Sequence, residues 1–110
     1  MLQVDFSSKA GYTVAHIIGR LDTVTATDFE GQMSKLISEG VTRIIFDCTK
    51  LGYMSSSGLR VFLLVQKQIS ALGGKLKVCC LQPSIREIFD ISGFSQIFSL
   101  FDSVESASQH

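Results

Sequence analysis

The sequence carries no excess of charge of either sign. Ten Lys and Arg residues offset ten Asp and Glu residues, and neither kind gathers in a block. Proteins that bind nucleic acid directly usually present a basic patch, and a membrane-spanning helix needs roughly 20 apolar residues. The apolar run Val61 to Val65 is far shorter than that. We therefore expect no direct contact with nucleic acid and no membrane insertion.

Cysteine is also scarce, and its pattern favours a cytoplasmic protein. The three cysteines, Cys48, Cys79 and Cys80, are odd in number and two of them are adjacent. That pattern suits neither a disulfide framework nor a four-ligand zinc site. The chain also begins without the basic and then apolar layout of a signal peptide. We predict that the cysteines are small core residues and that the protein uses no metal or cofactor.

Histidine is rarer still, which argues against a serine hydrolase. The two histidines are His16, in the middle of a predicted strand, and His110, the last residue. A serine nucleophile needs a base beside it, and a nucleophile elbow needs glycine two residues before the serine. The residue two positions before Ser56 is Met54. We therefore expect no enzymatic activity, and we expect His16 to be a hydrogen-bonded strand residue.

Apolar residues are plentiful enough for one folded domain over residues 1–110. They make up 45% of the chain, against 18% charged residues, a balance typical of globular proteins. Hydrophobic spacing and turn residues predict strands at 2–7, 12–19, 41–47, 75–81 and 97–101, and helices at about 25–40, 57–72 and 84–93, with a polar helix after residue 101. Capping boxes are predicted at Thr25 with Asp28 and at Ser84 with Glu87.

This order, β-β-α-β-α-β-α-β-α, predicts the α/β fold class. An initial hairpin followed by alternating strands and helices favours a mixed, mostly parallel sheet of about four or five strands flanked by about four helices. Binding sites in such sheets tend to lie beyond the carboxyl ends of the strands. The stretch "MSSSGL" (54–59) lies there, between a strand that ends at Asp47 and a helix that begins near Ser57.

Three serines at a helix start suggest a place for a negative group. The first turn of a helix has backbone N–H groups without intrahelical partners, and its dipole favours a negative charge, so a phosphoryl group on a serine there is stabilised. A helix cap needs only one serine. We assign that role to Ser57, or else to Ser56, and expect Gly58 to allow close packing.

The segment "FDCTKLGYMSSSGLRVFLL" (46–64) resembles the signature of the STAS domain, the family of bacterial anti-sigma factor antagonists. "GRLDTVTA" (19–26) is similar to the family's Gly-x-Leu-Asp motif, and "GGKLKVCCLQPSIREIFDISGF" (73–94) resembles its last strand-helix unit. The resemblance spans nearly the whole chain. It implies a STAS-like α/β domain that binds a protein partner.

In this family an unphosphorylated antagonist binds an anti-sigma factor that is itself a serine kinase. The resemblance implies that phosphorylation of one serine ends the interaction and that a serine phosphatase restores it. The family's phosphoserine matches Ser56. The acidic residue that often precedes it is replaced by Ser55, which makes Ser55 a rival acceptor.

The resemblance and the helix geometry together give a set of partner-binding candidates. Arg60 lies four residues after Ser56 and so shares its helical face. Asp22 matches the Asp of the Gly-x-Leu-Asp motif, and it serves either the structure or a partner contact. The family places both Asp22 and Asp47 near the serine loop, but we expect Asp47 mainly to accept N–H bonds from its own loop. Phe94 and Ile97 are either partner contacts or core residues. The partner-binding candidates are Asp22, Ser55, Ser56, Ser57, Gly58 and Arg60.

The sequence is also compatible with a second function. STAS-type domains also serve as accessory modules of transporters or other signalling complexes, without a phosphorylation switch. Ser55 stands where the family often has an acidic residue, and this replacement is compatible with that role.

Overall fold

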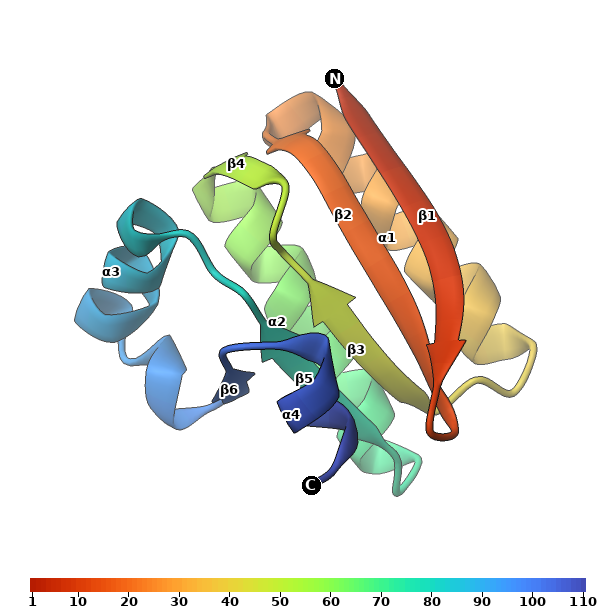
Figure 1. Ribbon diagram of the computed structural model, residues 1–110. Coiled ribbons are helices and arrows are strands. Elements are labelled where there is room, and N and C mark those ends of the chain that lie inside the picture. The colour runs from red at the N-terminus through yellow and green to blue at the C-terminus, as the bar shows by residue number, and fades with distance from the viewer.

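The computed structural model describes all 110 residues as alternating strands and helices (Figure 1). The elements are β1 (Leu2–Lys9), β2 (Tyr12–Leu21), α1 (Thr23–Ser38), β3 (Arg43–Asp47), β4 (Leu51–Met54), α2 (Ser56–Ala71), β5 (Lys75–Cys79), α3 (Pro83–Ser92), a 3₁₀ turn (Phe94–Gln96), β6 (Ser99–Phe101) and α4 (Val104–Ser108).

The strands form one mixed sheet in the order β1-β2-β3-β5-β6. Only β1 and β2 are antiparallel, and the other pairs are parallel. This confirms the predicted α/β class. The prediction of four or five strands was too low, because β4 is a separate short strand that pairs with β2 beyond the end of β3. Its sequence, Leu-Gly-Tyr-Met, is too short for hydrophobic spacing to reveal it.

The main core lies between one face of the sheet and helices α1, α2 and α3. A smaller cluster on the opposite face, which includes Tyr12, Val14, Ile45 and Cys79, packs against Ala107 of α4. Figure 1 shows α4 on the near side of the sheet, while α1 and α2 lie behind it. The short α4 covers only one end of the near face and leaves the rest of the face beside β1 and β2 open.

Five phenylalanine rings connect most elements of the main core. Phe62 of α2 lies at their centre, with ring centroids 4.7 to 6.3 Å from those of Phe29, Phe46, Phe89 and Phe98. These rings come from α1, β3, α3 and the segment before β6. The cluster therefore fixes the helices relative to the strand ends from which the serine loop emerges.

Two predicted helix starts were wrong by a few residues. Helix α1 is capped by Asp22, in a capping box with Thr25, so Thr25 is the third helical residue and not the cap. Helix α3 begins at Pro83, and its cap residue Gln82 makes no side-chain capping bond. Ser84 is therefore the second helical residue and not the cap. The helix starts one residue earlier because the fixed φ of Pro83 suits the first helical position.

No helix in the structure has the length and apolar character required to cross a bilayer.

Candidate partner-binding site at the start of helix α2

Helices α1 and α2 begin beside each other at the carboxyl ends of strands β2 and β4. Strands β2 and β4 run parallel and end at the paired residues Leu21 and Met54. Each strand turns directly into a helix, through Asp22 on one side and Ser55 on the other. The backbone N–H of Ser55 also donates to the carbonyl of Leu21 at 2.9 Å. The sequence motifs around Asp22 and around the three serines therefore lie side by side, where α1 and α2 begin (Figure 1).

Ser55, and not Ser57 or Ser56, caps helix α2. Its backbone is extended, and its side-chain oxygen accepts a hydrogen bond from the N–H of Gly58 at 3.3 Å. The prediction that Ser57 or Ser56 caps the helix was wrong, because β4 and its bond to Leu21 bring the chain into position for a cap one residue earlier. Ser57 lies within the first helical turn and is half-buried.

Gly58 lets the helix approach the end of β2 closely. A Cβ atom at this position would lie 2.9 Å from the Cδ2 atom of Leu21 and 3.1 Å from its carbonyl oxygen. Gly58 is buried. Gly58 therefore packs beneath the serine loop and has no side chain to offer a partner. This close packing is the role predicted for it from the sequence.

Ser56 and Arg60 are exposed, and both lie on helix α2. Ser56 is the first helical residue, and its hydroxyl makes no hydrogen bond within the chain, whereas the Ser55 hydroxyl is engaged by the cap. The first turn of α2 contains no acidic residue. The positive end of the helix dipole is therefore not offset by a local carboxylate.

Asp22 is held in its charged form by the start of α1. Its carboxylate accepts backbone N–H bonds from Thr25 at 2.9 Å and Val24 at 3.0 Å. These bonds, the Thr25 backbone bond foremost, lower the pKa of Asp22. Asp22 thus combines a capping role with a fixed negative charge at the edge of the serine loop.

Three further residues border this surface, and the sequence analysis missed them. Val24 is 83% exposed in the first turn of α1, and Tyr53 of β4 is 40% exposed. Arg20 lies over the Tyr53 ring, with its guanidinium carbon 4.2 Å from the ring centroid. The available signals in the sequence were the apolar Val24 at a helix start and the aromatic Tyr53 just before the serines. Neither signal indicates an exposed side chain unless the position of β4 is known.

Asp47 does not lie at the serine loop. Asp47 pairs with His16 of β2. His16 precedes Leu21 by five residues, so about 16 Å of strand separates Asp47's neighbour from the strand end where the serine loop begins. The expectation that Asp47 lies near the loop was therefore wrong, whereas its expected structural role is confirmed. Asp47 accepts bonds from the backbone N–H and the hydroxyl of Thr49 at 3.1 and 2.6 Å.

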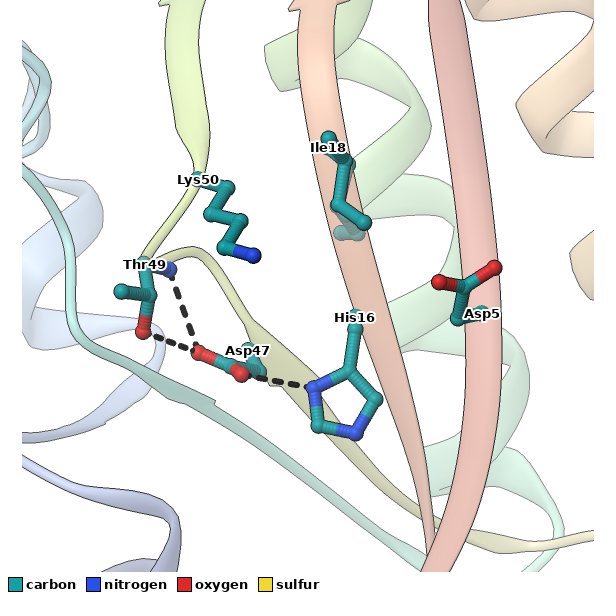
Figure 2. A pocket seen from close by; sticks show the side chains of 7 residues that line it. Asp5, His16, Ile18, Asp47, Thr49 and Lys50 are labelled. Carbon is teal, nitrogen blue, oxygen red and sulfur yellow. Dashed lines mark hydrogen bonds and ion pairs between the residues drawn. The ribbon is translucent and has the colours of Figure 1, made fainter.

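His16 and Asp47 form a polar chain on the open face of the sheet (Figure 2). The His16 Nδ1 atom lies 2.7 Å from Asp47 Oδ2, and the Nε2 atom lies 2.8 Å from the hydroxyl of Ser7. Partial burial acts to raise the pKa of Asp47, but the bonds from Thr49 and His16 outweigh it and lower that pKa. The pair borders a hollow of about 330 Å³ that Asp5 and Lys50 also line. His16 is therefore a hydrogen-bonded strand residue, as predicted.

The remaining predicted positions divide between core and surface. Phe94 packs against the main core, while Ile97 is 47% exposed. Cys48 and Cys79 are buried, as expected for core residues, and Cys80 is half-buried.

Comparison with known proteins connects these observations. The STAS domain profile matches residues 3–107. The chain belongs to the STAS domain family. This STAS protein is 39% identical over 97 residues to BtrV of Bordetella bronchiseptica, named as a candidate anti-sigma factor antagonist, with 88% of this chain and 84% of the relative covered. It is 30% identical over 107 residues to the anti-sigma F factor antagonist of Paenibacillus polymyxa, with 96% and 92% covered.

A solved structure shares the fold of this STAS protein over almost its entire length. The Bacillus cell-fate determinant SpoIIAA, solved in its phosphorylated form, matches with a TM-score of 0.75 and 25% identity. The match covers 97% of this chain and 96% of SpoIIAA.

Proposed function

We propose that this STAS protein is an anti-sigma factor antagonist whose docking surface is the start of helix α2 and whose switch is phosphorylation of Ser56. The observation that carries the proposal is the exposed, unbonded hydroxyl of Ser56 at an uncompensated helix N-terminus. The names of the two sequence relatives support the type of partner. The expected partners are a serine-kinase anti-sigma factor and a serine phosphatase.

Ser56 is a better acceptor than Ser55 for a structural reason. A kinase must bring the acceptor hydroxyl against the terminal phosphate of its nucleotide, which requires an accessible and uncommitted oxygen. The Ser56 side chain is exposed, whereas Ser55 is half-buried and its oxygen holds the Gly58 N–H. Modification of Ser55 would disturb the cap, but modification of Ser56 leaves the cap intact.

A phosphoryl group on Ser56 would change the surface more than the fold. It adds about 1.5 to 2 negative charges, which the free N–H groups and the dipole of the first turn stabilise. Arg60 lies one turn further along the helix and offers a positive charge on the same face. The domain therefore tolerates the modification, while a partner docked on that surface meets a new charge that must be desolvated.

The replacement of the family's acidic residue by Ser55 fits this account. Ser55 still provides the capping oxygen for Gly58, so the helix start does not need a carboxylate there. A neutral residue next to Ser56 also avoids repulsion between a carboxylate and the phosphoryl group. Recognition by the kinase would then depend on other charges at this surface, and Asp22 is the nearest fixed negative charge along the two helix starts.

A binding titration with the cognate serine-kinase anti-sigma factor tests the docking surface. Ser56→Asp places a negative charge on the surface, and we expect it to weaken binding at least tenfold. Ser84→Asp is the matched control, because Ser84 is also an exposed serine in the first turn of a helix, α3. Equal affinities for Ser56→Asp and the wild-type protein would contradict the proposed switch.

A phosphorylation assay with the same kinase tests the acceptor. We expect Ser56→Ala to abolish most phosphate incorporation and Ser55→Ala to retain it. Incorporation that survives in Ser56→Ala and is lost in Ser55→Ala would move the acceptor to Ser55. Binding to a transporter subunit, with no phosphorylation of either serine, would instead support the accessory-module role.

A further inference from the structure

The end of strand β5 carries two adjacent cysteines in an unusual conformation. Cys79 is the last strand residue, and Cys80 follows with a φ of 64°, in the left-handed region that non-glycine residues rarely adopt. Hydrogen bonds hold the backbone on both sides: the Cys79 carbonyl accepts from the Cys48 N–H at 3.0 Å, and the Cys80 N–H donates to the Phe101 carbonyl at 3.0 Å. Backbone strain of this kind in a non-glycine residue often marks a functional site.

The left-handed turn changes where the second sulfur points. In a continuous strand, adjacent side chains lie on opposite faces of the sheet. Val78 faces the main core and Cys79 faces the smaller cluster, so an extended Cys80 would return to the core side. Instead, the sulfurs of Cys79 and Cys80 and a carboxylate oxygen of Asp47 all lie within 4.8 Å of one another.

Asp47 is held in place for this arrangement from its other side. Its neighbour on β5 in the sheet register is Cys79, and its carboxylate is oriented by His16 and by Thr49 (Figure 2). Metal-binding carboxylates in proteins are typically hydrogen-bonded in this way by outer residues. The cluster therefore has a fixed oxygen donor, two sulfur donors and supporting hydrogen bonds.

We propose that Asp47, Cys79 and Cys80 form a binding site for a thiophilic divalent cation of the zinc class. Tetrahedral zinc, with bonds of about 2.3 Å to sulfur and about 2.0 to 2.2 Å to oxygen, needs its ligands roughly 3.5 to 3.8 Å apart. A closure of about 1 Å from the observed spread meets that requirement. Three protein ligands leave a fourth position for water. The site is independent of the phosphorylation switch proposed above.

The two sulfurs differ in exposure. Cys79 is fully buried in the smaller cluster. A bound cation displaces the thiol protons and takes their place. Cys80 is only half-buried, so a metal ion can reach the site from the side of its sulfur. Without metal, the Cys80 thiol donates a hydrogen bond to the Asp102 carbonyl at 3.4 Å.

Titration of the full-length, reduced protein with Co²⁺ and then Zn²⁺ tests the site. Co²⁺ bound by thiolates gives a sulfur-to-metal charge-transfer band, and we expect one equivalent that Zn²⁺ displaces. Cys80→Gly is the decisive variant, because glycine accepts the positive φ without strain and so removes the sulfur while preserving the fold. We expect it to fold normally, as judged by thermal melting, and to lose the band.

Two further variants separate the site from general thiol binding. Cys48→Ala removes the remaining cysteine, which lies outside the cluster, and should leave the Co²⁺ band unchanged. His16→Ala should weaken the affinity by about 10- to 100-fold without abolishing it, as expected for a residue that orients a ligand. A wild-type protein without the band, or a folded Cys80→Gly protein that retains it, would overturn the proposal.

Discussion

At the scale of single residues, Ser55 and Ser56 are chemically identical neighbours with different tasks. The hydroxyl of Ser55 completes the N-terminus of α2, and that of Ser56 remains free. The sequence identified three serines at the start of a helix but could not tell which of them caps it. Which serine caps the helix depends on where β4 delivers the chain, and no feature of three consecutive serines encodes that position.

This division of tasks predicts that alanine substitution has unequal effects on stability at the two positions. Ser55→Ala removes the capping oxygen and should lower the free energy of unfolding by about 1 kcal/mol. Ser56→Ala removes an exposed, unbonded hydroxyl and should change it by less than about 0.5 kcal/mol. Urea unfolding of both variants beside the wild-type protein makes the measurement. A larger loss for Ser56→Ala than for Ser55→Ala would show that the cap is misassigned.

Asp22 gives a residue-scale prediction that depends on pH. Its pKa in the folded protein lies below the ordinary value of 3.8 because α1 donates N–H bonds to the carboxylate. A lowered folded pKa stabilises the native state at pH values above the unfolded pKa, and this contribution is lost as the pH falls through the folded pKa. The stability difference between wild type and Asp22→Asn should therefore shrink on acidification. NMR titration of the Asp22 carboxyl carbon should give a midpoint below 3.8, and a midpoint above it would contradict the assigned cap.

At the scale of elements, the position of the serine loop depends on how closely α2 meets β2. Hydrophobic spacing correctly predicted a helix after the serines, because its buried positions recur with helical period. It could not predict β4, whose four residues pair only with the end of β2. That pairing is a contact between distant parts of the sequence, so local pattern carries little information about it.

Gly58→Ala tests this close approach. Alanine normally favours a helix over glycine by about 1 kcal/mol, but overpacking against Leu21 costs about 1 to 3 kcal/mol. We expect the clash to exceed the helix preference, giving a net destabilisation of about 1 kcal/mol in urea unfolding. Gly31→Ala in α1 is the matched control, because its added Cβ meets no atom within 4 Å. Stabilisation by Gly58→Ala would show that Leu21 yields and that the contact is loose.

At the scale of the whole molecule, one core positions the two helix starts together. The alternating strand and helix pattern was sufficient to predict the α/β class, since a parallel sheet follows from that order. The placement of Asp47 was not predictable in the same way. Its separation from the serine loop arises because β3 and β4 occupy successive positions along β2, whereas the hydrophobic pattern of the sequence reveals only β3 as a strand.

The phenylalanine cluster should dominate the stability of the fold. Phe62→Ala empties the centre of a ring cluster shared by three helices and β3, and should cost about 3 to 5 kcal/mol. Leu72 is 56% exposed and caps the C-terminal end of α2, so Leu72→Ala should cost less than about 0.5 kcal/mol. Equilibrium unfolding compares the two variants. Similar small losses for both would mean that the cluster is not the common support of the helices.

The central claim, a phosphorylation switch at Ser56, is most directly tested by mapping the modification in protein isolated from its native cells. Trypsin cleaves after Lys50 and Arg60 and so releases residues 51–60, which contain the three adjacent serines. Fragmentation of this peptide by mass spectrometry distinguishes them. The account predicts one phosphoryl group, on Ser56. A phosphoryl group on Ser55 alone, or a peptide that is unmodified throughout growth and stress, would contradict it.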